Sequence, residues 1–320
     1  MENKIYHPRI VFMGTPDFAV ASLKALLENQ YDVVAVVTMP DKPKGKHHSI
    51  LQASPVKEYA LSKTIPVLQP ENLKDPSFIE KLQSFQADLQ IVVAFRMLPE
   101  IVWAMPPRGT FNLHASLLPQ YRGAAPINWA IISGEKETGV TTFFLDKEID
   151  TGKIIDRRKA PIGENDHAGI VHDRLMEIGA DLVVKTVEDI IHERIKPIPQ
   201  DQLICPDEKL KTAPKLFKET CKIHWEQSTQ EVYDFIRGLS PHPASWAELP
   251  LKNGETLSLK VFDSEKIKEA HSYTPGSIRT ENKHLEVSTK DGFIRLKLIQ
   301  PAGKKQMKAD DFLRGNAHLL

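Results

Sequence analysis

Strands and helices are expected to alternate over the first 190 or so residues, and this alternation constrains the fold most strongly. Short apolar runs rich in β-branched residues occur at 9–15, 32–38 and 88–95. Segments with helical apolar spacing follow the first two runs, one with Asp17 as the expected N-cap and one with Ser54 as cap before a proline. Such runs suit strands buried on both faces, so we expect a Rossmann-like, mostly parallel α/β sheet flanked by helices.

The pattern changes after about Glu193. Residues 194–213 are proline-rich with little periodicity, so we expect a linker there. Short alternating segments follow, and the sequence Lys-Asp-Gly at 290–292 is a turn signal between the last two. We therefore predict a catalytic domain at 1–193 and, at 214–320, a small antiparallel β-barrel (OB-like) or sandwich.

Cysteine content and charge bound the class of protein. The chain has two cysteines, and its 42 Lys and Arg balance its 42 Asp and Glu. There is no disulfide framework, the N-terminal apolar run is too short for a signal peptide, and no run could span a bilayer. These features predict a cytoplasmic protein without membrane contact, and we expect a monomer.

Polar residues at predicted strand ends suggest the site. A dinucleotide loop is not expected, because Thr15, Pro16 and Asp17 follow Gly14 where G-x-G-x-x-G would continue. Asn112 and His114 are two apart on a likely strand and therefore share a face. An amide and an imidazole there could bind the oxygen of an attacked acyl group and move a proton.

Asp150 follows 36 residues after His114 and could orient the imidazole or position a water that relays protons. The simpler alternatives stay open on these residues alone. Asn112 and His114 could be a polar pair in a sheet, and Asp150 could cap a turn.

Several motifs together resemble the folate-dependent formyltransferases. The central ones are "FNLHASLLPQYRGAAPINWAI" and "GEKETGVTTFFLDKEIDTGKII", with "MGTPDFA", "VVTMPDKPKGK" and "SPVKEYA" upstream. Downstream, "APKLFKETCKIHW", "IRGLSPHPASW" and "LIQPAGKKQMKADDFLRG" also fit, so the resemblance extends along nearly the whole chain. The downstream motifs are similar to those of family members that act on aminoacylated tRNA.

The resemblance implies a reaction. A formyl group would move from 10-formyltetrahydrofolate to the α-amine of methionine on initiator tRNA, with Asn112 and His114 stabilising the tetrahedral intermediate and Asp150 holding the histidine. No metal is needed, because hydrogen bonds can bear the developing oxyanion.

The resemblance also implies a folate site. It would be lined by two segments, namely Phe95, Arg96, Met97 and Leu98, and Ser116, Leu117, Leu118 and Pro119. Arg96 stands where the family usually has glycine, and the residues leave open whether it faces solvent or an acidic part of the ligand. Read alone, the second segment could instead pack its leucines into the core.

Two groups of lysines are expected to bind RNA phosphates. The first lies in a long, mobile loop and comprises Lys42, Lys44 and Lys46; the second comprises Lys304, Lys305 and Lys308. Without the resemblance, the first group reads as ordinary charged surface, whereas for the second group an ordinary charged turn and an RNA-binding role stay equally open. Trp225 and Trp246 are expected in the core rather than as base-stacking residues.

Two rival functions remain. One is a formyltransferase whose acceptor is a sugar nucleotide or glycinamide ribonucleotide. The other is a tRNA-binding module that has lost its folate chemistry, against which the complete Asn112, His114 and Asp150 set argues.

Overall fold

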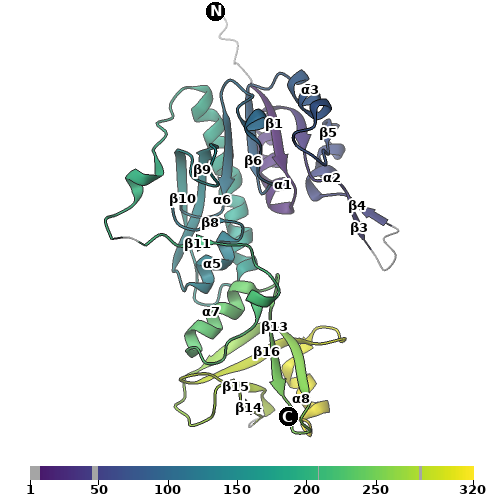
Figure 1. The fold of residues 1–320 in the computed structure, drawn as a ribbon, viewed down its shortest axis with the longest axis vertical. Coiled ribbons are helices and arrows are strands. Elements are labelled where there is room, and N and C mark those ends of the chain that lie inside the picture. The colour runs from purple at the N-terminus through teal and green to yellow at the C-terminus, as the bar shows by residue number, and fades with distance from the viewer. Residues whose placement is uncertain (1–7, 45–49, 208, 281–282) are drawn as a thin grey trace, which may run out of the picture. The chain divides into compact units, whose positions relative to one another are not determined.

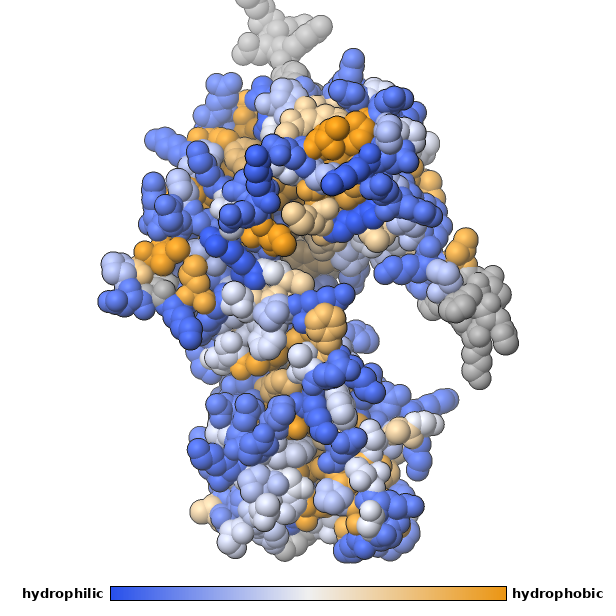
Figure 2. All heavy atoms as spheres, in the orientation of Figure 1, coloured by the Kyte–Doolittle hydropathy of each residue, from blue (hydrophilic) through white to orange (hydrophobic). Residues whose placement is uncertain are grey.

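The described chain forms two compact units. The computed structural model (Figure 1) describes residues 8–44, 50–207, 209–280 and 283–320. Unit 1 comprises Met1–Arg122, Gly139–Ala160 and His172–Lys211. Unit 2 comprises Gly123–Thr138, Pro161–Val171 and Thr212–Leu320. On the face shown in Figure 2, hydrophilic side chains dominate and apolar ones form separate patches.

A seven-stranded sheet in the order β10-β9-β7-β6-β1-β2-β5 organises unit 1. Its strands are β1 (Arg9–Gly14), β2 (Asp32–Val37), β5 (Val67–Leu68), β6 (Leu89–Val93), β7 (Thr110–His114), β9 (Glu137–Phe144) and β10 (Ile154–Pro161). The pairs β1–β2, β1–β6, β2–β5 and β6–β7 are parallel, and β7–β9 is antiparallel. The prediction of a mostly parallel sheet is thus confirmed.

Helices cover this sheet. They are α1 (Asp17–Glu28), α2 (Pro55–Ser62), α3 (Pro76–Ser84), α4 (Glu100–Trp103) and α6 (Ala168–Ile191). Helix α6 packs on β7, since an added Cβ at Gly179 would lie 2.8 Å from Leu113 Cδ2. Within the described ranges, no helix is both long and apolar enough to cross a membrane.

The helix caps were predicted with mixed success. Ser54 caps α2 as expected, because its Oγ accepts from the Lys57 N–H at 3.1 Å. The prediction for Asp17 is wrong, since Pro16 is the N-cap and Asp17 is the first helical residue. Pro16 is already extended (φ −79°, ψ 175°), so the helix begins at Asp17, one residue earlier than it would if Asp17 were the cap.

Strands β3 (Lys42–Lys44) and β4 (Ile50–Gln52) form an antiparallel hairpin that extends from unit 1 in Figure 1. At its base, the Asp41 carboxylate accepts from Lys57 Nζ at 2.6 Å and from Gln69 Nε2 at 2.7 Å. These hydrogen bonds hold the pKa of the Asp41 carboxyl below its usual value, and the hydrogen bond from Lys57 contributes most. The predicted loop is therefore built on paired strands with an anchored base.

Unit 2 is dominated by an antiparallel sheet in the order β12-β13-β16-β15-β14, with β17 beside β16. The strands are β12 (Ser245–Pro250), β13 (Thr256–Ile267), β14 (Ile278–Arg279), β15 (Glu286–Ser288), β16 (Phe293–Pro301) and β17 (Met307–Lys308). The helices of this unit include α5 (Pro126–Ile132), α7 (Thr229–Leu239) and α8 (Ala309–Asn316). The predicted antiparallel C-terminal domain is confirmed, and the Thr289 N–H closes the predicted turn on the Gly292 carbonyl at 2.8 Å.

The core of unit 2 contains one of the two tryptophans predicted there. Trp225 is 8% exposed and packs among residues of α7 and the sheet such as Ile236 and Val261. Trp246 is half-buried and does not belong to this core, so its prediction is wrong. The reason is strand alternation, because its neighbours Ala247 and Ser245 are buried while Trp246 points to the other face of β12.

Candidate functional site

The carboxyl ends of β1, β6 and β7 form the edge where ligands of open α/β sheets bind. The order of the strands reverses here, because β1 is followed outward by β2 on one side and by β6 on the other. Gly14 is the last residue of β1 and is closely surrounded, since an added Cβ would lie 2.9 Å from the Val93 carbonyl oxygen and 2.6 Å from Ala19 Cβ. A glycine is therefore required where these two strands end side by side.

Asn112 and His114 occupy the end of β7, on the face away from α6. Register places Asn112 opposite Phe143 and His114 opposite Thr141 on β9. Asn112 is half-buried, and His114 is only 7% exposed. The expectation that the two side chains share a strand and a face agrees with this register.

The His114 ring is held by one clear hydrogen bond. Its Nε2 lies 2.9 Å from the carbonyl oxygen of Tyr121. A carbonyl can only accept, so Nε2 carries a proton and Nδ1 is the basic nitrogen of the neutral ring. This contact leaves Nδ1 as the nitrogen that can take up a proton.

Asp150 lies beside that nitrogen. Its Oδ2 is 3.8 Å from His114 Nδ1, and the carboxylate is 14% exposed. This distance is too long for a direct hydrogen bond but short enough to stabilise a positive charge on the ring. The structure thus brings two of the three predicted catalytic side chains together, across 36 residues of sequence. Among the described residues, no group of three His, Cys, Asp or Glu side chains could hold a metal ion.

Gln200 is the residue that sequence reasoning missed. It is 3% exposed, begins η1 (Gln200–Leu203) and donates from Nε2 to the carbonyls of Asp150 and Gly152 at 2.8 and 2.9 Å. Its Oε1 accepts from Arg122 Nε and Nη2 at 3.0 and 2.7 Å.

Arg122 directly follows Tyr121, whose carbonyl holds His114. Gln200 therefore connects the backbone that carries Asp150 with the backbone that holds His114. We call Gln200 and Arg122 the clasp. A lone glutamine in a proline-rich stretch gave no signal of this contact.

The Asp150 turn is conformationally demanding. Asp150 has φ of 57°, the left-handed region that Asp tolerates better than most residues. At Gly152, an added Cβ would lie 1.7 Å from the Phe144 carbonyl oxygen, so only glycine fits. The two Gln200 hydrogen bonds thus hold a turn that the chain does not adopt readily by itself.

The predicted segment Ser116–Pro119 is fixed to β9. Thr141 Oγ1 donates to the Ser116 carbonyl at 2.7 Å and accepts from the Leu118 N–H at 3.1 Å. Leu118 is fully buried with Phe143 and Ile154, and Ser116 is fully buried as well. Pro119 is also buried and Leu117 is half-buried, so this segment offers a ligand mainly backbone.

The other predicted folate segment lies after β6. Leu98 is buried and Phe95 packs on the same core, whereas Met97 is 68% exposed. Leu145 packs against this core and also against the cluster around Leu118, so the two segments share a neighbour.

The Arg96 side chain is hydrogen-bonded to the backbone that follows β5. Its Nη1 donates to the Glu71 carbonyl at 2.8 Å, and its Nη2 donates to the Pro70 carbonyl. Burial lowers the pKa of the Arg96 guanidinium. Its charged head is therefore tethered to the backbone after β5, and contact with an acidic part of the ligand stays a prediction.

The predicted RNA-binding lysines are exposed wherever the structure describes them. Lys42 is exposed on β3, Lys44 is described by its backbone alone, and Lys46 lies outside the described residues. In unit 2, the exposed lysines are Lys304, Lys305 and Lys308. The Lys304 ammonium lies 5.7 Å from the centroid of the Phe312 ring.

Comparison with solved structures places the fold. The chain has a TM-score of 0.65 to HypX from Aquifex aeolicus in complex with tetrahydrofolic acid, at 19% identity, covering 96% of this chain and 47% of that one. The TM-score to WlaRD, a sugar 3N-formyl transferase, is also 0.65, at 22% identity, covering 94% of this chain and 100% of that one. These similarities concern the fold alone.

Comparison with curated sequences is closer. The chain is 61% identical to the methionyl-tRNA formyltransferase of Azobacteroides pseudotrichonymphae genomovar. CFP2, over 98% of this chain and 97% of that one. It is 58% identical to the methionyl-tRNA formyltransferase of Parabacteroides distasonis, over 96% and 95%. The formyl transferase family model matches residues 8–187, and the formyl transferase C-terminal domain model matches residues 215–317. The chain therefore belongs to the formyl transferase family.

Proposed function

We propose that this enzyme transfers the formyl group of 10-formyltetrahydrofolate to the α-amine of methionine esterified to initiator tRNA. High identity to methionyl-tRNA formyltransferases along almost the whole chain supports this substrate pair. The observation that carries the chemistry is the position of Asp150 Oδ2, 3.8 Å from the basic nitrogen of His114. Folate and charged tRNA are both substrates in this reaction.

The reaction requires a proton acceptor near the attacking amine. The lone pair of the neutral amine forms a bond to the formyl carbon, and the carbonyl oxygen becomes an oxyanion. The nitrogen must then lose a proton, and His114 Nδ1 is unprotonated when Nε2 donates to the Tyr121 carbonyl. Asp150 stabilises the imidazolium that forms, because its carboxylate lies beside Nδ1.

The tetrahedral intermediate then collapses. The bond between the formyl carbon and N10 of the folate breaks, the oxyanion returns to a carbonyl, and N10 gains a proton. His114 can supply that proton, which restores the ring to its starting state. Each proton taken up is thus given back, and no redox change occurs.

Asn112 has the role of an oxyanion donor. Its amide lies on the same face of β7 as His114, two residues earlier, and an amide N–H can donate to a developing negative charge. Loss of one such donor typically costs about 10²- to 10³-fold in kcat. Because the side chain is carried by a strand that is paired on both sides, with β6 and with β9, little reorganisation is needed when charge develops.

The substrate assignment is tested by presenting several acceptors to the purified chain with 10-formyltetrahydrofolate. The panel comprises methionyl-initiator tRNA, the uncharged tRNA, an amino-sugar nucleotide and glycinamide ribonucleotide, and tetrahydrofolate release is followed. We expect turnover with the charged tRNA alone. Turnover restricted to a small amine would overturn the tRNA assignment while preserving formyl transfer.

A further inference from the structure

A row of side chains crosses the outer face of the unit 2 sheet. Register pairs Trp246 on β12 with Lys260 on β13, and Lys260 in turn with Gln300 on β16. Directly paired residues in antiparallel strands point to the same face, so the three side chains stand side by side. Their neighbours in sequence, such as Ala247 and Leu259, point into the core.

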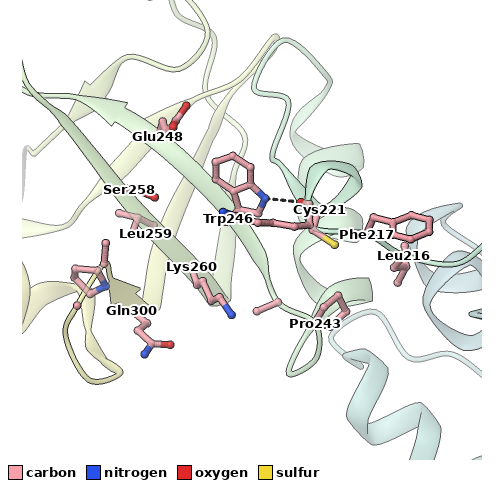
Figure 3. A pocket seen from close by; sticks show the side chains of 15 residues that line it. Leu216, Phe217, Cys221, Pro243, Trp246, Glu248, Ser258, Leu259, Lys260 and Gln300 are labelled. Atoms are coloured by element: carbon pink, nitrogen blue, oxygen red, sulfur yellow. Dashed lines mark hydrogen bonds between the residues drawn. The ribbon is translucent and has the colours of Figure 1, made fainter. Parts of the chain in front are cut away.

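This row forms one wall of a cavity of about 650 Å³ that lies wholly within unit 2. Figure 3 shows Trp246, Lys260 and Gln300 on the strands, with Phe217 and Leu216 contributed by the segment before α7. The volume is within the range of small-molecule sites, roughly 300 to 1,000 Å³. The cavity is therefore large enough for one planar ring system with a charged substituent.

The Trp246 indole is oriented and surrounded by cations. Its Nε1 donates to the Lys218 carbonyl at 2.7 Å, as drawn in Figure 3. The ammonium groups of Lys218 and Lys222 lie over the ring, 5.6 and 5.1 Å from its centroid. The hydrogen bond fixes the ring, while the two lysine side chains are the groups that can move.

Charge at the cavity is predominantly positive. Lys222 is paired with Glu248 at 2.7 Å, which leaves Lys218 and Lys260 as exposed cations around the indole. On an ordinary protein surface, a tryptophan ring packs only against the aliphatic parts of lysine side chains. A ring in a cavity, with cations on its face and on the next strand, matches both parts of a nucleotide. Bases stack on aromatic faces, and lysines bind phosphate.

We propose that this face binds a single nucleotide, with its base on the Trp246 indole and its phosphate held by Lys218 and Lys260. The nucleotide can come from an unstacked position of an RNA substrate or from a free mononucleotide, and the first source rests on the proposed function. The Lys218 ammonium, which lies over the indole, would turn to the phosphate once a base stacks there. Sequence-tolerant stacking of this kind contributes about 1–3 kcal/mol per base.

Two binding measurements on the intact protein separate the sources. Adenosine and cytidine 5′-monophosphates are titrated by isothermal titration calorimetry, and methionyl-initiator tRNA is titrated by anisotropy. The variants are Trp246→Leu, Trp246→Phe and, as a matched control on the same sheet domain, Lys290→Gln, whose side chain is exposed and does not line the cavity. Circular dichroism of each variant reports folding.

The RNA source is supported if Trp246→Leu weakens RNA binding about 5- to 100-fold while Trp246→Phe retains most of the affinity. Calorimetric binding of a mononucleotide that Trp246→Leu abolishes supports the free nucleotide. A folded Trp246→Leu protein that binds both ligands like wild type overturns the proposal. Formyl transfer by wild type is measured in parallel, so failure of the function and failure of this site are distinguished.

Discussion

The strand ends of unit 1 and the outer sheet face of unit 2 hold their polar groups in different ways. At the strand ends, His114 and Asp150 are nearly buried, and Tyr121 and Gln200 fix their surroundings by hydrogen bonds. On the outer face, Lys218 and Lys260 are exposed, while the Trp246 ring is fixed by a hydrogen bond and Lys222 is paired with Glu248. Catalysis needs groups already in place, because reorganisation adds to the barrier, whereas phosphate binding tolerates motion.

This difference predicts which kinetic constant each region controls. Changes at His114 and at the clasp should lower kcat, since His114 is the proposed proton acceptor and the clasp holds its surroundings. Changes in the proposed folate segment should raise the KM for 10-formyltetrahydrofolate. Changes on the exposed lysines should raise the KM for RNA and its salt dependence, with kcat unchanged at saturation. A variant that breaks this division would show that the two regions are not separate in function.

The largest effect is expected for His114→Ala. Removal of the proton acceptor should reduce kcat by about 10²- to 10⁴-fold, because that is the usual contribution of general acid–base catalysis. Single-turnover formylation of methionyl-initiator tRNA measures the loss directly. His224→Ala, at an exposed position of unit 2, is the control and should turn over like wild type. Unchanged formylation by His114→Ala would show that the catalytic base lies elsewhere.

The clasp should come next. Gln200→Glu keeps the shape and the acceptor for Arg122 but removes the two N–H groups that hold the Asp150 turn. We expect kcat to fall about 10- to 100-fold, since a displacement of about 1 Å at a site costs up to 10². The Kd for RNA should not change. Gln202→Glu, exposed in the same short helix, is the matched control.

A loss of stability of Gln200→Glu without a fall in kcat would reduce the clasp to a structural contact. A double variant with Arg122→Lys sharpens this test. If the two residues act as one unit, the second substitution should add little to the first.

The comparison also shows what a sequence can predict. The apolar runs and Ser54 were sufficient for the sheet and for α2, because periodicity and capping are local. Asn112 and His114 were found as a pair because strand geometry alone puts them on one face. Gln200 and Arg122 were missed, since their contact joins segments 78 residues apart and depends on a single amide. Trp246 was misplaced because an aromatic residue in an alternating strand fits either face.

Arg96 gives a third, smaller effect at the strand ends. Arg96→Gly removes the tether to the carbonyls of Pro70 and Glu71. We expect the KM for 10-formyltetrahydrofolate to rise roughly 5-fold through loosening of the segment from Phe95 to Leu98, since such hydrogen bonds contribute about 1 kcal/mol. Arg96→Lys should not restore binding, because an ammonium lacks the planar fork that reaches two carbonyls. Initial-rate kinetics at varied folate check this, and an unchanged KM for both variants contradicts it.

The smallest effect on kcat is expected where side chains are most exposed. Replacing Lys304, Lys305 and Lys308 by alanine should leave kcat at saturating RNA unchanged and weaken RNA binding. Each lysine that contacts a phosphate contributes roughly 1 to the slope of log K against log salt, so the slope should fall by up to about 3. Lys304 lies against Phe312 and should contribute least, because its ammonium must leave the ring to reach a phosphate. RNA titrations between low and physiological salt measure the slope, with Lys290→Ala as the control. A slope equal to that of wild type would remove these lysines from the RNA interface and leave the Trp246 face as the candidate contact in unit 2.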